Sequence, residues 1–474
     1  MRNKLALTAM TAFGMAAALT MLEGDANACG GCFVPTENPT VVSDHRMILS
    51  VSKEQSTLYD QIKYSGSPSS FAWVLPFTGT IEVGLSADIV FQTLDVNTQT
   101  RINPPPQNCP PPPDCGFRNS SAGAPSSAED GKGGGVTVTK REVVGPFETV
   151  QLKATNKDAL RAWLVSNGFA MPDDVKLVVD KYVEESYDFL ALKLIPGKSV
   201  QDMRPVRVTT KGAGTTLPLR MVAAGTGPVV GVSLWIVAEG RYETQNFPSF
   251  VIPTDEIAWD WTQSKSNYTE IRAQKTTAGK GRAWEIESST LVDRGNVESS
   301  VTNGFVFNPN GGGGGGGAPV PSDPEERAQQ SYLPVKDAQG VVTKTAQQVR
   351  TEDLTTLFYG IPSASARVTR LRADLVHAAL VDDLRLTASA DQAVLSNVRQ
   401  LTKEINEPLC PVFNGCDSAG QAPRSEAIAR SDASAKDESF ACTTSSRTST
   451  PAWLGLGGGF LALALVKAAR RRRG

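Results

Sequence analysis

The spacing of apolar and polar residues predicts a chain built mainly from β-strands. From residue 46, RMILSVS leads through the polar turn SKEQ into STLYDQIKYSG, where Leu58, Asp60, Ile62 and Tyr64 fall on one face. The run SFAWVLPF (70–77) is almost continuously apolar, which suits a strand buried on both faces. Strands and glycine turns alternate over 205–239, as in a meander, and EIAWDWTQ, EIRAQKT and RAWEIESS predict more β-structure.

Helical periodicity appears in fewer places. Ser86 is a candidate cap for a helix with Val90 and Leu94 on its inner side. DALRAWLVSNG and the segment from Pro172 predict a helix-turn-helix pair, with Gly168 ending the first helix. Further on, EDLTTLFYG predicts a helix, RVTRLRADL fits a strand or a helix, and DDLRLTAS fits a strand. The pattern predicts an α+β fold, a β-rich antiparallel core with a helix-turn-helix insertion.

Composition divides the chain, which at 474 residues is long enough for two or three domains. Proline and glycine concentrate in NPPPQNCPPPPDCG with its Ser/Gly-rich continuation, and in NPNGGGGGGGAPVPSDPEE. The first reads as a stiff external loop, with a proline-rich ligand for another domain as the alternative; the second reads as a linker. We therefore predict a signal peptide (1–28), a β-rich body (29–306) with a Pro/Gly-rich loop (103–135), a Gly/Pro linker (307–326), a C-terminal α/β part of the body (327–416), a disordered stalk (417–451), a transmembrane or sorting helix (452–469) and a basic tail (470–474).

The N-terminus has the features of a secretory signal. Arg2 and Lys4 precede an apolar run, and Ala26-Asn27-Ala28 ends in an A-x-A pattern before Cys29. We expect cleavage between Ala28 and Cys29. An uncleaved anchor, or acylation of Cys29, is the alternative.

The C-terminus combines Cys442, a short apolar run and a cluster of arginines. The uncharged residues 452–466 span about 22 Å as a helix, short of a hydrocarbon core of roughly 30 Å. The order of cysteine, glycine-containing helix and arginines resembles the myxobacterial C-terminal sorting signal. That resemblance implies processing or lipidation near Cys442 and delivery to the cell surface, whereas a permanent anchor is the alternative. Expected partners are the membrane and the machinery for export and C-terminal processing.

Seven cysteines suit an oxidising compartment. The disulfide candidates are Cys29, Cys32, Cys109, Cys115, Cys410 and Cys416, which leaves Cys442 over. Six cysteines allow 15 connectivities, and pairing of sequence neighbours is the simplest of them. The C-x-x-C spacing of Cys29 and Cys32 also permits a redox role, but the pair lies ahead of the first strand, which favours a structural disulfide.

The sequence holds no complete catalytic constellation. His45 and His377 are the two histidines, and neither a G-x-S-x-G elbow nor H-E-x-x-H occurs, so we predict no catalytic or metal site and no cofactor. Gly225 to Gly231 reads as a hairpin turn rather than a dinucleotide loop. The acid pairs Asp173-Asp174 and Asp382-Asp383 read as helix-dipole partners, with calcium as the alternative. The formal net charge of −2 gives no field that would attract nucleic acid.

Four stretches resemble a family of exported bacterial proteins known only as domain of unknown function 2330. They are CGGCF after the signal peptide, TLYDQIKYSGSPSSFAWVLPF, DALRAWLVSNGFAMPDDVKLVVDKYVEESYDFLALKL, and RVTRLRADLVHAALVDDLRL. The resemblance implies an exported, membrane-associated protein and no established activity. We therefore expect an envelope-anchored or surface-displayed protein that binds or assembles with an envelope protein or polysaccharide. The alternative is an envelope enzyme, either a hydrolase or a thiol oxidoreductase that uses Cys29 and Cys32.

Overall fold

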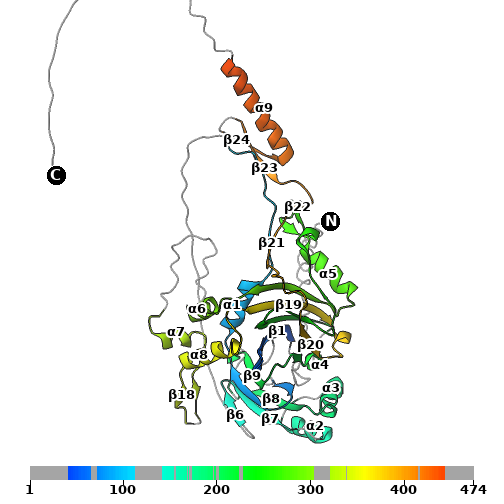
Figure 1. Cartoon of the computed structure of the whole chain (residues 1–474), viewed down its shortest axis with the longest axis vertical. Helices are drawn as coiled ribbons and strands as arrows, with labels where there is room; N and C mark the ends of the chain where they lie inside the picture. Colours follow the sequence, from blue (N-terminus) through cyan, green and yellow to red (C-terminus); the bar gives the residue numbers. More distant parts are fainter. Residues whose placement is uncertain are drawn as a thin grey trace, which may run out of the picture. The chain divides into compact units, whose positions relative to one another are not determined.

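The computed structural model describes most of the chain between residues 41 and 443 (Figure 1). Excepted are residues 66–71, 113–140, 154–155, 168, 170–172, 196, 199–201, 224–227, 304–320, 338 and 415–416. The chain forms two compact units, of which the larger includes residues 118–406 and everything up to Pro106. The smaller unit is formed by 107–117 and the chain from Glu407 onward.

An eight-stranded sheet forms the centre of the larger unit. Its strands lie in the order β13 (Ser249–Phe250), β16 (Trp284–Leu291), β19 (Ala366–Val376), β11 (Val229–Glu239), β1 (Val41–Val51), β2 (Gln55–Ser65), β9 (Val206–Lys211) and β4 (Ile81–Leu85). Most neighbours are antiparallel, as expected, but β1 pairs with β11 and β13 with β16 in parallel. The prediction of an antiparallel core was therefore too narrow. The long stretch of chain between β1 and β11 allows the second strand to return in the same direction.

Strand β19 lies between β16 and β11 in the sheet. In the chain it comes after both of them, on the far side of the glycine-rich linker. The chain between the glycine-rich linker and Asn406 is therefore part of the larger unit, and its strand β19 is built into the central sheet. Eleven residue pairs join β19 to β11 in unbroken register, from Glu239 opposite Ala366 to Val229 opposite Val376. RVTRLRADL, left open between strand and helix by its sequence, is a strand.

A second sheet packs beside the first. It contains β3 (Ala72–Phe77), β8 (Asp188–Leu194), β7 (Phe147–Leu152) and β6 (Arg141–Val144). Trp73 and Leu75 of β3 join one apolar cluster while Val74 joins another. This confirms the expectation that the strand is buried on both faces.

The predicted helix-turn-helix pair is α2 (Lys157–Ser166) and α3 (Asp173–Glu184), inserted between β7 and β8 (Figure 1). Leu160, Leu164, Val175 and Val179 of the pair pack with Val74 and Phe189 of the second sheet. Asn156 caps α2 by accepting hydrogen bonds from two backbone N–H groups.

Other helices of the larger unit are α1 (Asp88–Thr98), α4 (Leu219–Val222), α5 (Tyr268–Ala278), α6 (Arg294–Asn303), α7 (Pro324–Gln329) and α8 (Ala346–Leu357), with 3₁₀ turns at Thr254–Glu256 and His377–Ala379. Helices pack on both faces of the eight-stranded sheet: α1, α6, α7 and α8 contribute to the apolar cluster on one face and α4 to the cluster on the other. Small sheets complete this unit: β10 (Thr216–Leu217) with β20 (Leu384–Ala388) and β12 (Tyr242–Thr244); β15 (Lys265–Ser266) with β14 (Ala258–Asp260) and β22 (Lys403–Glu404); β17 (Val335–Lys336) with β18 (Val342–Lys344); and β21 (Val398–Gln400) with β5 (Arg101–Asn103).

Several local predictions were wrong for identifiable reasons. EIRAQKT lies in α5, because its Glu, Arg, Ala, Gln and Lys favour a helix over a strand. TTLPLRMVAA is broken at Pro218, which lacks a backbone donor, into two strand residues and α4. Ser86 does not cap α1, whose N-cap is Ala87; the Ser86 hydroxyl donates instead to Asp353, 2.7 Å away. Residues 324–326 of the predicted linker begin α7, because Asp323 caps it and Pro324 suits its first turn.

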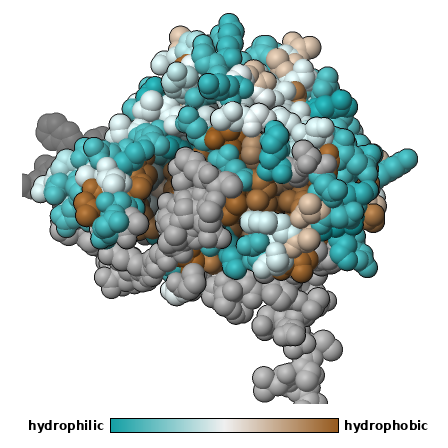
Figure 2. Space-filling view, turned by 90° about the horizontal axis from the view of Figure 1, so that it is seen from below, coloured by the Kyte–Doolittle hydropathy of each residue, from teal (hydrophilic) through white to brown (hydrophobic). Residues whose placement is uncertain are grey.

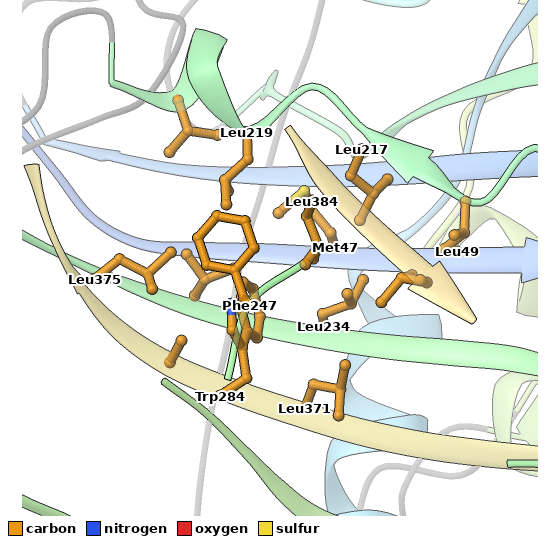
Figure 3. Packing of buried hydrophobic residues seen from close by; sticks show 14 of the residues in the cluster. Met47, Leu49, Leu217, Leu219, Leu234, Phe247, Trp284, Leu371, Leu375 and Leu384 are labelled. Atoms are coloured by element: carbon orange, nitrogen blue, oxygen red, sulfur yellow. The ribbon is translucent and has the colours of Figure 1, made fainter. Parts of the chain in front are cut away.

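Apolar residues fill both faces of the large sheet. Alternate residues of β11 separate, so that Leu234 and Ile236 face one cluster while Trp235 and Val237 face the other. Figure 3 shows the first cluster, in which Phe247 and Trp284 pack with Leu234, Leu371 and Leu375. Figure 2 shows the surface on one side of the molecule, which is mostly polar with apolar residues gathered toward the centre of that view.

The smaller unit contains β23 (Leu409–Asn414), β24 (Asp417–Pro423) and α9 (Arg424–Thr443). The predicted disordered stalk was therefore wrong for residues 417–443; residues 444–451 lie outside the described part. Ala427 of α9 packs with Cys410, Val412 and Ala422, and the Ala-rich segment suits a helix. Ala427 is the residue of α9 that joins this apolar cluster in the described part of the chain. The helix therefore needs no continuous apolar face, and its sequence shows no helical periodicity of apolar residues.

Candidate functional site

An imidazole and a carboxylate meet in the interior of the larger unit. His45 on β1 and Asp60 on β2 share a face, because Asp60 lies opposite Met47, two residues from His45. The His45 Nδ1 and Asp60 Oδ1 atoms are 3.4 Å apart, and the two residues are 2% and 4% exposed. Ionisable side chains are rarely this buried, so the pair stands out from the surrounding core.

The surroundings of this pair are mainly apolar. His45 and Asp60 border a cavity of about 20 Å³, which holds about one water molecule, together with Leu58, Trp73 and Leu219. Asp60 also borders a second cavity of about 30 Å³, whose lining includes Gln61, Asp88 and Arg204. Asp60 therefore contacts two spaces of the size of a water molecule.

Burial raises the pKa of Asp60, and the nearby His45 partly opposes this shift. A proton on Asp60 is therefore held more tightly than on an exposed carboxylate. Among the described lining residues of the two cavities there is no serine, threonine or cysteine. The arrangement can orient a water molecule or a polar ligand group and exchange a proton with it.

A second polar cluster surrounds Asp353 of α8, which is 1% exposed. Ser86 donates to it at 2.7 Å, Tyr332 at 3.0 Å and the Arg207 guanidinium at 3.4 Å. Burial raises the pKa of Asp353 to about 6, against the opposing effect of these donors. All of its partners are fixed side chains, so this cluster ties α8 to the sheet.

A third cluster lies on the face of the sheet that carries Trp235. The guanidinium carbons of Arg46 and Arg370 each lie 5.0 Å from the Trp235 ring centroid. Arg370 also pairs with Asp95 and Glu287. Buried arginines and carboxylates here neutralise one another, which identifies a structural ion-pair network.

At the edge of this network, Tyr268 of α5 donates to Glu285 at 2.6 Å. Burial raises the pKa of Glu285 to about 7; the Tyr268 hydrogen bond opposes the shift and Glu287 adds to it. Glu285 and Glu287 are 1% and 4% exposed. We place the candidate site at His45 and Asp60 because both of these buried residues border cavities.

The sequence analysis predicted no site here and named Asp60 only as one residue of a strand face. Asp60 on the apolar face of the predicted strand was the available signal, and Leu58 and Asp60 do face one side. His45 was assigned no catalytic or metal role, and its nearness to Asp60 was missed because strand pairing brings the two residues together across 15 residues of chain. His377 is elsewhere, where its Nε2 lies 3.2 Å from the Ala223 carbonyl oxygen.

The predicted cysteine sites divide between described and undescribed residues. Cys109 and Cys410 form a disulfide in the smaller unit, across a sequence separation of 301 residues. Neighbour pairing was therefore wrong for these two cysteines, because the fold and not chain proximity brings them together. Cys29, Cys32, Cys115 and Cys416 and the cleavage position Ala28 lie outside the described residues. Cys442 falls within α9, with its side chain undescribed.

Several predicted segments at the ends and in the loops fall partly or wholly outside the described residues. The loop 113–135, the linker up to residue 320 and the helix 452–469 lie outside the described residues. No described helix has the length and apolar character needed to cross a membrane. Within the described part there is also no group of three or more metal-ligating side chains. The hairpin expected at Gly225 is only partly described, with Pro228 leading into β11.

A family model described as "Uncharacterized protein conserved in bacteria (DUF2330)" matches residues 24–306, and the chain belongs to this family. No curated protein and no solved structure matches the chain. The matched range contains His45 and Asp60 but ends before β19, the strand that joins β16 to β11. The family match therefore covers less than the folded unit.

Proposed function

We propose that this DUF2330 protein is exported to the cell envelope, where it binds or assembles with envelope components. The observation that carries the proposal is the disulfide between Cys109 and Cys410. Disulfides persist in oxidising compartments and are rare in the cytosol. The A-x-A pattern before Cys29 supports the same location.

The C-terminal sequence supports display at the surface. Cys442 and the arginines from Arg470 to Arg473 have the order of a C-terminal sorting signal. We propose that export and processing machinery acts on both ends, with Cys442 as the processing or lipidation position. The membrane and an envelope protein or polysaccharide are the proposed partners.

Fractionation of cells followed by non-reducing peptide mapping tests this function. We expect the protein in the envelope fraction, an N-terminus at Cys29, a peptide that joins Cys109 to Cys410, and a C-terminus near Cys442. A C442S variant should retain the tail, whereas the matched S446A variant should be processed normally. Recovery in the cytosol with Cys109 and Cys410 reduced would contradict the proposal.

A second candidate function is hydrolysis, which the His45–Asp60 pair and its adjoining cavities favour. In that case the pair would activate water, since no hydroxyl or thiol side chain lines the described walls. H45Q and D60N would each abolish hydrolysis of an envelope ester or glycoside without a change in location. Thiol oxidoreductase activity through Cys29 and Cys32 is the third candidate, and alkylation of both thiols in native protein would support it.

A further inference from the structure

A shallow groove of about 750 Å³, widely open to solvent, lies beside α8. Its described lining contains no aliphatic side chain. The lining includes Gln347, Gln348, Thr351, Glu352, Thr355 and Tyr359. They supply hydroxyl and carboxamide groups, one carboxylate and one aromatic ring.

Four of these side chains form a row. Gln347, Thr351, Thr355 and Tyr359 recur at intervals of four residues, so they project from one side of the helix and its C-terminal end. Within the helix, Gln347, Thr351 and Thr355 are separated by steps of about 6 Å along the axis, from the helical rise, and Tyr359 follows just beyond its C-terminal end. All four are exposed, with Tyr359 at 48%. The spacing is comparable to the length of one sugar ring in a polysaccharide chain.

The groove carries little free charge. Glu352 is its one charged residue among the described lining, and it forms ion pairs with Arg207 and Lys344. Gln348 is occupied in the capping box with Thr345. By contrast, the side chains of Gln347 and Thr355 have no hydrogen-bond partner within the described residues, and the Thr351 hydroxyl donates to the Gln347 carbonyl, which leaves its acceptor capacity free.

This composition is unusual for a face that only contacts water. Exposed helix positions favour Lys, Glu, Gln and Ala, which form helices well, whereas threonine is a weaker helix former. Here Thr351 and Thr355 occupy two exposed positions one turn apart. Recognition of a ligand explains hydroxyl groups at positions where helix stability alone favours other residues.

The chemistry of the groove selects one class of ligand. A lipid needs an apolar lining, and a nucleic acid needs arginines and lysines that remain free for phosphate. A neutral polysaccharide offers hydroxyl groups to the Thr and Gln side chains and an apolar ring face to Tyr359. We propose that the α8 groove binds a neutral polysaccharide. This inference rests on the binding role proposed above and names its ligand class.

The test uses the purified full-length chain and immobilised neutral glucans, mannan and galactan, with polygalacturonate as the acidic comparison. We expect binding to at least one neutral polysaccharide. Y359A should weaken it by about tenfold or more, and Y359F, which retains the ring, should bind within about twofold of the parent. T351A/T355A should also weaken binding while the helix is retained, because alanine is the better helix former. T269A, on an exposed threonine of α5, is the matched control and should bind normally.

Absence of binding to every neutral polysaccharide would overturn the inference, as would binding that Y359A and T351A/T355A leave unchanged. Preference for polygalacturonate would overturn it as well. These results do not depend on location. An envelope protein that binds no polysaccharide contradicts the groove assignment alone, whereas a cytosolic protein that binds one contradicts only the proposed location.

Discussion

The disulfide between Cys109 and Cys410 allows a quantitative prediction. Its two segments leave the larger unit shortly after β5, at Pro106, and shortly after β22, at Asn406. With that unit folded, the bridge closes a loop of roughly 15 residues, which corresponds to about 3 kcal/mol in the chain-entropy model. With the whole chain unfolded, the separation is 301 residues and the same model gives about 6 kcal/mol. The difference, about 3 kcal/mol, is the contribution of the bridge to the free energy of unfolding of the larger unit.

We therefore expect two separate effects of C109S/C410S in a parent that already carries C115S/C416S. Hydrogen exchange in the hairpin of β23 and β24 should accelerate by on the order of 100-fold. The free energy of unfolding of the larger unit, measured with urea, should fall by about 3 kcal/mol. The control C442S should change neither quantity. A double variant with unchanged exchange and unchanged urea stability would refute the proposed constraint.

Three further predictions concern the larger unit. G84A places a Cβ 2.5 Å from the Arg207 Nε, so it should displace Arg207 from Asp353 and lower the free energy of unfolding by about 1–3 kcal/mol; unchanged urea stability would contradict this. The folded-state pKa of Glu285, about 7, exceeds its ordinary value of 4.5, so its contribution to stability is present below pH 4.5 and is lost as the pH rises to 7. In the E285Q variant, the free energy of unfolding measured with urea at pH 4.5 and at pH 8 should no longer show this loss of about 3 kcal/mol. An equally steep pH dependence of the free energy of unfolding in the variant would contradict the assignment. Residues 29–306 alone should show no cooperative thermal unfolding because they lack β19, whereas 29–406 should unfold cooperatively; similar melting of both would show that β19 is dispensable.

Local patterns predicted local structure well. The alternation through Leu58 and Asp60 gave β2, and the two apolar helix faces gave α2 and α3, because neighbouring residues suffice to define these elements. The strand at 270–276 was wrong because its single isoleucine was given more weight than the helix-forming residues around it. Propensity determined the structure there, since α5 buries no side chain fully.

The candidate site could be predicted only in part, because its residues meet through strand pairing. Asp60 was recognisable as a polar residue on an apolar face. Its approach to His45 depends on the register of β1 and β2, and its cavities depend on β3 and α4, which no short sequence pattern contains. The groove on α8 was missed for another reason: threonine and glutamine on a helix look like an ordinary solvated surface until a hollow is found beside them.

The central position of β19 has a consequence for the order in which the protein matures. The chain is made from its N-terminus, so β11 and β16 exist for more than seventy residues of further synthesis before the strand between them appears. Until then each has an unpaired edge that can associate with other chains. Pairings between residues so distant in sequence also form slowly. A newly made chain is thus vulnerable to aggregation until residue 376 is available, and a chaperone that shields these two strands would act during this interval.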